Sequence, residues 1–308
     1  MFVSLSPEQL HALGEVSEFY RLPAMGPPRD DENRPVRVRF GLLADPQYAD
    51  VDPDPSHVRY YRHSLEKLAQ VIDELNQQPL DFVVTLGDLV DRQWSSYADI
   101  LPLYRRLKHP HLTVMGNHDA DTLSRHLASQ RPALALPKHY FHFSFAGYCF
   151  IAIDGNDLSL YCNQANGDEQ LRAQHMLGQL QAQGAIQAQP WNGGLGEAQL
   201  DWLAQTLQTA AQRHEQIIVF GHYPLAPEDR HNLWNHQAVV ALLVKYRARA
   251  YFAGHQHAGG YQRIDGTDFI TLKGLVDGAR STPFAVVELY GNTLTLHGYG
   301  TQHSLTLK

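Results

Sequence analysis

Short apolar runs alternate with amphipathic helical segments through the first 120 residues, and this alternation limits the fold more than any other feature. VRVRFGLLA (36–44), DFVVTLGD (81–88) and HLTVMGNHD (111–119) have the composition of buried strands. Helical periodicity at 57–78 and 97–109 separates them. Strands joined through helices form parallel, right-handed crossovers, so the sequence predicts a layered α/β core.

The second half of the chain adds antiparallel hairpins to this parallel pattern. A Gly-containing turn divides the apolar stretch 139–154, and DG and GN turns divide 260–274 and 284–300. Two further strands are expected at 216–222 and 248–257, and two helices at 195–214 and 236–247. The fold class expected from this order is a four-layer α/β/β/α sandwich, in which helices flank two packed mixed β-sheets.

The order of segments also predicts the domain organisation. A serine cap and helical spacing at 6–20 predict a short leading helix, and the stretch 23–35, rich in proline and charge, predicts a linker. Together these form an N-terminal part, 1–35, in front of a single domain, 36–308. Residues 155–195 are rich in Gln, Ala and Asn, so we expect a partly helical surface excursion or cap there.

Composition excludes several classes of protein. The formal net charge of −7 argues against nucleic-acid binding through a broad basic face. No apolar run reaches the roughly 18 residues that a membrane span requires. The N-terminus lacks the basic start and apolar stretch of a signal peptide, and two cysteines form no disulfide framework. We therefore expect a cytoplasmic protein that binds neither nucleic acid nor a membrane, and we expect a monomer or weak oligomer.

Five of the predicted strands end in polar groups that bind metals. In α/β sheets ligands bind beyond the carboxyl ends of strands, so these groups are expected to converge. Any one of them, taken singly, is better explained as a turn or a helix cap. Their joint occurrence after apolar runs favours a metal site. The candidate ligands are Asp45, Gln47, Asp88, Asn117, His222, His255 and His257.

The chemistry of these ligands indicates which ions they bind. A set of carboxylates, amides and imidazoles without thiolate suits Mn, Fe or Zn better than Ca. Seven ligands exceed the need of one tetrahedral ion. Two ions about 3.5–4 Å apart, sharing one carboxylate, would use them all, and such pairs hydrolyse phosphate esters. We expect two divalent ions, with Mn²⁺ preferred and Fe or Zn possible in one site.

The ordered motifs D-x-(H or Q), GD, GNH(D or E), GH and GHxH resemble those of the calcineurin-like metallophosphoesterases, from about Val36 to the end. ADPQYAD, RYYRHSL, DGNDLS, WNGGLGEAQLDWL and AGHQHAGGY resemble one branch, the manganese-dependent ADP-ribose/CDP-alcohol diphosphatases. This resemblance implies the metallophosphoesterase fold. It also implies a small nucleoside-diphosphate-linked substrate, ADP-ribose and/or a CDP-alcohol, whose pyrophosphate bond is hydrolysed by a metal-bridging hydroxide.

The resemblance also implies individual roles. Asp45, Gln47 and His257 would hold a first ion, and Asp88 would bridge both ions. The second ion would be held by Asn117, His222 and His255. His118 would lie near the leaving oxygen of the substrate as the catalytic residue and would bind no metal.

Three residues are candidates for substrate binding. Arg62 has a planar fork that suits a phosphate, but a surface ion pair explains it equally well. Asn192 and Gly193 precede a long helix, where a bare turn is the ordinary explanation, and their match to WNGG in the branch favours a substrate or cap role. The competing functions are another phosphodiesterase of this fold, such as a 3′,5′-cyclic nucleotide phosphodiesterase, a non-catalytic scaffold, and a nuclease, which the acidic charge disfavours.

Overall fold

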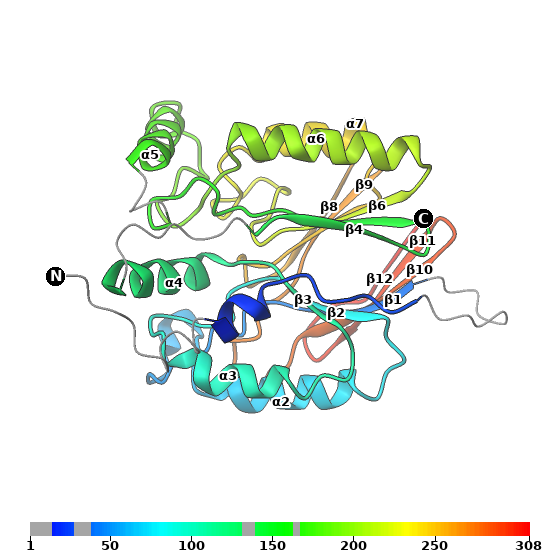
Figure 1. Ribbon diagram of the computed structural model, residues 1–308. Coiled ribbons are helices and arrows are strands. Elements are labelled where there is room, and N and C mark those ends of the chain that lie inside the picture. Colours follow the sequence, from blue (N-terminus) through cyan, green and yellow to red (C-terminus); the bar gives the residue numbers. More distant parts are fainter. Residues whose placement is uncertain (1–13, 28–37, 131–138, 163–166) are drawn as a thin grey trace.

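Two six-stranded mixed sheets pack face to face in this computed structural model, which describes residues 14–27, 38–130, 139–162 and 167–308 (Figure 1). Helices cover the outer face of each sheet, so the layers run helix, sheet, sheet, helix. The predicted four-layer α/β/β/α sandwich is therefore confirmed.

The first sheet has the strand order β12-β11-β10-β1-β2-β3. β1 lies in its centre, parallel to β2 and antiparallel to β10, and β2 is parallel to β3. Its strands are β1 (Val38–Leu43), β2 (Phe82–Thr85), β3 (His111–Thr113), β10 (Phe284–Tyr290), β11 (Thr293–Tyr299) and β12 (Leu305–Leu307).

The second sheet has the order β4-β5-β6-β7-β9-β8. The central strands β5, β6, β7 and β9 are parallel, and a hairpin closes each edge. Its strands are β4 (Phe141–Phe145), β5 (Tyr148–Ala152), β6 (Gln216–Phe220), β7 (Ala250–Ala253), β8 (Gly260–Ile264) and β9 (Thr267–Thr271).

Amphipathic helices form the two outer layers. α2 (His63–Leu75) and α3 (Ser96–Tyr104) pack on the first sheet, and α6 (Glu197–Gln212) and α7 (His236–Lys245) pack on the second. Figure 1 shows these two pairs on opposite sides of the molecule. Further helices in the described residues include α4 (Asn117–Gln130), α5 (Gly167–Ala182) and a 3₁₀ helix, η1 (Pro55–His57).

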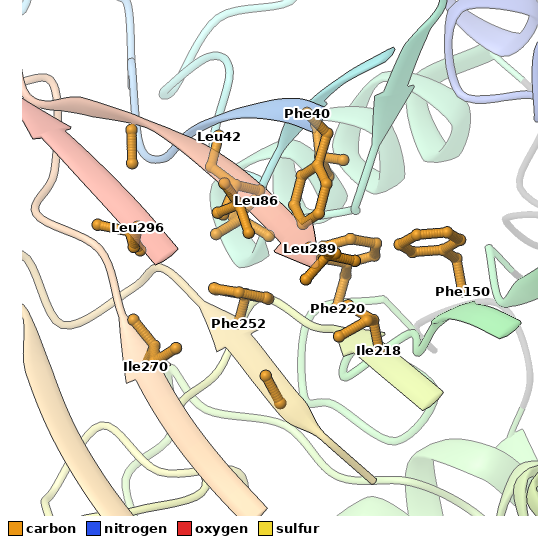
Figure 2. Close-up of a cluster of buried hydrophobic side chains, with 14 of the residues drawn as sticks. Phe40, Leu42, Leu86, Phe150, Ile218, Phe220, Phe252, Ile270, Leu289 and Leu296 are labelled. Atoms are coloured by element: carbon orange, nitrogen blue, oxygen red, sulfur yellow. The ribbon is translucent and has the colours of Figure 1, made fainter. Parts of the chain in front are cut away.

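A dry aromatic cluster joins the two sheets. Phe40 in β1 stacks on Phe82 with ring centroids 5.1 Å apart. It also meets Phe150, Phe220 and Phe252 of the second sheet edge-on, at centroid distances of 5.8–6.0 Å (Figure 2). Aromatic pairs in this geometry gain about 0.5–1.5 kcal/mol beyond the area they bury. This cluster fixes how the two sheets lie against each other.

Three local details differ from the sequence-based expectations. The helix expected over 57–78 begins only at His63, because the segment before it pairs with a later loop: the Tyr60 amide donates to the Val276 carbonyl at 3.0 Å. α4, which begins at Asn117, and the short edge strand β12 were not predicted. β12 has only three residues, too few for a readable alternation.

The N-terminal part and the excursion both contact the sandwich. Residues 14–19 are helical and Val16 is buried against α3, while 1–13 and most of the predicted linker, 28–35, lie outside the described residues. Within 155–195, α5 packs through Ala173 and Leu177 onto Trp234, in a small core of its own.

Replacing Phe40 with alanine should lower the free energy of unfolding by about 3–5 kcal/mol, since it opens a cavity between the sheets. Phe40→Leu should lose clearly less, because most of the volume is kept. Urea unfolding followed by circular dichroism measures both. Tyr290→Ala, at a side chain that is 53% exposed, should stay within about 0.5 kcal/mol of wild type. Equal losses for all three variants would contradict this account of the core.

Candidate functional site

The predicted strand ends meet at one end of the sandwich. The Gln47 amide donates to the Asp88 carbonyl at 2.7 Å, and the Asp45 amide donates to the Gly87 carbonyl at 3.1 Å, so the segments after β1 and β2 run side by side. Across the two sheets, the His255 amide donates to both Asp45 carboxylate oxygens at 3.1 Å. Parallel strands in both sheets therefore bring residues more than 200 positions apart into contact.

One group of predicted ligands gathers around Asp88. His222 Nε2 lies 3.4 Å from Asp88 Oδ2 and 3.0 Å from Asn117 Oδ1. Ligand atoms of Asp88, His222 and His255 all lie within 4.8 Å of one another, close enough for one ion. All four side chains are buried.

The other predicted ligands gather around Asp45. His257 Nε2 lies 3.7 Å from Asp45 Oδ1, and both side chains are largely buried. Gln47 is fully buried; its Oε1 accepts a hydrogen bond from Arg59, and its Nε2 has no hydrogen-bond partner. The amide oxygen has two lone pairs, so Oε1 can accept from Arg59 and still offer one lone pair to an ion, whereas Nε2 can only donate a hydrogen bond.

Each of the three histidines has one ring nitrogen held by a neighbour. His222 Nδ1 donates to the Leu86 carbonyl at 2.7 Å. Asn192 uses its Nδ2 to donate to two carbonyls, so its Oδ1 accepts from His255 Nε2 at 2.9 Å. His257 Nδ1 pairs with Asp277 Oδ1 at 2.8 Å. The other nitrogen of each ring is left with a free lone pair when the ring is neutral, as metal binding requires.

Four of the predicted ligands have a left-handed backbone although none is glycine. The φ angles are 52° at Asp45, 47° at Gln47, 54° at Asp88 and 65° at His255. Such residues cost free energy and gather where the surrounding structure holds a functional geometry. The backbone here turns sharply after each strand, which aims the side chains at the shared end of the sheets.

Gly116 permits the closest approach in the site. A Cβ at this position would lie 2.1 Å from Asp88 Oδ1 and 2.2 Å from the Asp88 amide nitrogen. No side chain fits in that space. The glycine of the GNHD motif is thus required because the Asp88 carboxylate packs directly on it.

His118 lies beside this group without belonging to it. Its backbone amide donates to Asp88 Oδ1 at 2.9 Å, and its Nδ1 pairs with Asp91 Oδ1 at 2.9 Å. Burial disfavours the charged ring, but Asp88 and Asp91 outweigh burial and raise the pKa of His118 to about 9. The imidazole is about one-third exposed, so it faces solvent at the edge of the site.

The electrostatics of the site fit divalent cations. Burial raises the pKa of the Asp45 carboxyl. Burial would also raise the pKa of Asp88, but the positive charges of His222 and His118 outweigh burial and hold that pKa well below the usual range. Burial disfavours the charged form of His222, yet Asp88 raises the pKa of that ring to about 9. Buried carboxylates thus draw protons onto the imidazoles, and a metal ion would supply the missing positive charge.

The three candidate substrate contacts have different environments. Arg62 is exposed and pairs with Asp50 and Asp52. Asn192 is fully buried and holds His255, as described above. Gly193 lies against a neighbouring loop, where a Cβ would be 2.2 Å from the Gly155 carbonyl oxygen. Substrate binding by these residues stays a prediction.

Sequence reasoning missed several residues of the site. Asp91 lies three positions after Asp88 in the same segment, and a second carboxylate so close to the GD motif could have identified it from the sequence. Asp119 accepts hydrogen bonds from the amides of Leu89, Val90 and Gly116, and so ties the turn after β2 to the turn after β3. Asp277 follows no strand and carries no motif, so only its tertiary contact reveals it.

The family of the protein follows from comparison with known sequences. The model of the calcineurin-like phosphoesterases matches residues 38–259, well over half of the chain. The protein therefore belongs to the calcineurin-like phosphoesterase family, and it is a metal-dependent phosphohydrolase.

Two relatives are named manganese-dependent ADP-ribose/CDP-alcohol diphosphatase. The Arabidopsis thaliana protein is 29% identical over 84% of this chain and 93% of its own length. The Homo sapiens protein is 28% identical over 85% of this chain and 90% of its own length. A solved dimetal phosphatase from Danio rerio is 25% identical, with a TM-score of 0.79 over 89% of this chain and 99% of that one. The predicted family resemblance is confirmed.

The described part of the chain was also searched for membrane spans. None of its helices combines the length and the apolar character needed to cross a bilayer.

Mn²⁺ should raise the melting temperature of metal-stripped protein, because a ligand at 100 times its Kd stabilises the folded state by about 2.7 kcal/mol per site. Asp88→Asn should remove most of this rise, since it takes the charge from the carboxylate on which both predicted sites depend. Differential scanning fluorimetry with and without MnCl₂ measures it. Asp50→Asn, at the exposed partner of Arg62, is the control and should keep the full response. An undiminished response in Asp88→Asn would contradict the assignment.

Proposed function

We propose that this protein hydrolyses the pyrophosphate bond of ADP-ribose and of CDP-alcohols such as CDP-choline, CDP-glycerol and CDP-ethanolamine. The observation that carries the proposal is the convergence of two carboxylates, two amides and three imidazoles at the shared end of both sheets. The relatives that share this chain over most of its length bear the name of that activity.

The two groups of side chains divide naturally between two ions. Asp45, Gln47 and His257 would hold the first, on the side of the site nearest the end of β1. The second would be held by Asn117, His222 and His255. Asp88 would bridge the two ions. Its position supports this, because its backbone carbonyl accepts from the Gln47 amide of the first group and its carboxylate contacts His222 of the second.

Two divalent ions at these positions, when bound, would polarise the phosphoryl oxygens and lower the pKa of a water molecule that attacks phosphorus. The chain's own contribution is the choice of ion. Gln47 provides a neutral amide oxygen where an imidazole would be a softer ligand, and this favours Mn²⁺ over Zn²⁺. An amide also cannot be lost to protonation, so this ligand is insensitive to pH.

His118 is the residue placed to act on the leaving group. Asp91 Oδ1 lies 2.9 Å from His118 Nδ1, and the Asp88 carboxylate accepts from the His118 backbone amide. Both the ring and the backbone of His118 are therefore held in place. Nε2 is then the nitrogen available to the substrate. As a proton donor to the departing phosphate oxygen, it would contribute about 10²–10⁴-fold to the rate.

The products follow from hydrolysis of one P–O–P bond by one water. ADP-ribose would yield AMP and ribose 5-phosphate, and a CDP-alcohol would yield CMP and a phosphoalcohol. Each cleavage adds a hydroxyl to one phosphorus and leaves the other phosphate as the departing group.

The test is a substrate panel on metal-stripped enzyme with ADP-ribose, CDP-choline, CDP-glycerol and cyclic AMP, each with Mn²⁺, Mg²⁺ or Zn²⁺. We expect turnover of ADP-ribose or the CDP-alcohols, fastest with Mn²⁺, and release of AMP or CMP measured by chromatography. Preferential cleavage of cyclic AMP would instead support a cyclic nucleotide phosphodiesterase. Equal activity with zinc alone would contradict the assigned effect of Gln47.

His118→Ala should lower kcat by about 10²–10⁴-fold while both metals stay bound, because the ring donates a proton and binds no ion. Kinetics at saturating Mn²⁺ and metal content by mass spectrometry measure the two effects separately. His142→Ala, at an exposed histidine on β4 whose ring contacts Trp202, serves as the control and should keep wild-type kcat. Loss of metal from His118→Ala would show that the residue is a ligand.

A further inference from the structure

The loop 274–278, between β9 and β10, contacts the end of β1 where the first predicted ligand stands. The Leu275 amide donates to the Ala44 carbonyl at 2.9 Å, and the Val276 amide donates to the Asp45 carbonyl at 2.9 Å. The loop thereby fixes the backbone of Asp45, whose left-handed conformation needs support from its surroundings.

The same loop encloses the His257 ring. The Gly274 amide donates to the His257 carbonyl at 3.1 Å, and a Cβ on Gly274 would lie 2.6 Å from His257 Cγ. Asp277 Oδ1 accepts from His257 Nδ1 at 2.8 Å. The ring is therefore held on one face by backbone and at one nitrogen by a carboxylate, which leaves only Nε2 for an ion.

The loop reaches the third ligand of the first site through Arg59. Arg59 and Asp277 form an antiparallel β-bridge, and the neighbouring Tyr60 amide donates to the Val276 carbonyl at 3.0 Å. The Arg59 guanidinium in turn donates to Gln47 Oε1. The loop thus contacts two of the predicted ligands of the first ion directly, Asp45 and His257, and it contacts Gln47 through Arg59.

Lys67 on α2 holds this loop through hydrogen bonds to its backbone carbonyls. It projects from α2 and is buried, with 2% of its surface exposed. Its ammonium donates to three carbonyls of the loop: Leu275, Gly278 at 2.9 Å and Asp277 at 3.3 Å. An ammonium has three N–H donors and no acceptor, so the three hydrogen bonds to this loop use all of its donors.

The ligands of the second ion depend on other groups. His222 is held by the Leu86 carbonyl, and His255 by Asn192. Leu86 follows β2, and Asn192 lies in the segment before α6. The two groups of ligands touch where the His255 amide donates to the Asp45 carboxylate. The rings of His222 and His255 are nevertheless oriented by groups outside the loop 274–278.

We propose that Lys67 and Asp277 are positioning residues that set the affinity of the first metal site, Asp45, Gln47 and His257, without touching substrate. Lys67 fixes the loop, and the loop fixes the Asp45 backbone and the tautomer of His257. Partners of this kind around a ligand change metal affinity by about 10–100-fold. The inference rests on the two-ion assignment of the proposed function.

The test is a titration of metal-stripped protein with MnCl₂, in which electron paramagnetic resonance measures free Mn²⁺ and no substrate is present. Wild type should bind two ions. Lys67→Met and Asp277→Ala should weaken one of the two by about 10–100-fold and leave the other within twofold. Asp277→Asn should lose less than Asp277→Ala, since its amide oxygen still accepts from His257 Nδ1. Excess Mn²⁺ should restore kcat in all three.

Leu207→Ala is the control for general loss of stability. Leu207 is fully buried on α6, in the core of the opposite helical layer, so its truncation should lower the melting temperature and change neither Mn²⁺ affinity. Should Lys67→Met fail to fold, the comparison of Asp277→Ala with Asp277→Asn decides the question, because only the alanine variant removes the acceptor of His257 Nδ1.

The outcomes separate the inference from the proposed function. Wild type that binds fewer than two Mn²⁺ ions overturns the two-ion assignment itself. Wild type with two ions, but variants with wild-type affinity at both sites, overturns the role of Lys67 and Asp277. Equal weakening of both sites also overturns it, because the loop would then act on the whole molecule.

Discussion

The site depends on burying two carboxylates at the end of an apolar sandwich. Asp45 and Asp88 are almost fully inaccessible, and burial alone favours their neutral forms. Charge in such a place must be matched by opposite charge. His222 and His118 provide part of it, and a pair of divalent ions would provide the rest. The glycines, the left-handed turns and the fixed imidazoles around the two acids all serve this one requirement.

Much of the fold was predictable from the sequence because its signals are local. The alternation of apolar runs and helical segments gave β1 to β3 and the helices between them, and the DG and GN turns gave the hairpins. The strand that was not predicted, β12, is short. β12 has three residues, and it is a strand only because β11 offers it a free edge. The start of α2 was wrong since a loop more than 200 residues away competes for the residues before it.

The candidate ligands were also readable, since each follows an apolar run in a short motif. Their supports were not. Asp277, Lys67 and Asn192 follow no motif that names a partner, and each acts through a contact that exists only in the folded chain. Asn192 shows the difference well. Its sequence context predicts a substrate or cap role, and only the folded chain shows that its side chain also makes hydrogen bonds to His255 and two carbonyls.

The central position of β1 has a consequence for synthesis. β1 pairs with β2 on one side and with β10 on the other, with Val38 opposite Leu289. During synthesis β1 can complete its pairing only after β10 has been made, and contacts between residues so far apart in sequence are slow to form. The ligands near residue 255 and the loop at 274–278 emerge equally late. The complete metal centre therefore cannot form before residues 274–278 have been synthesised.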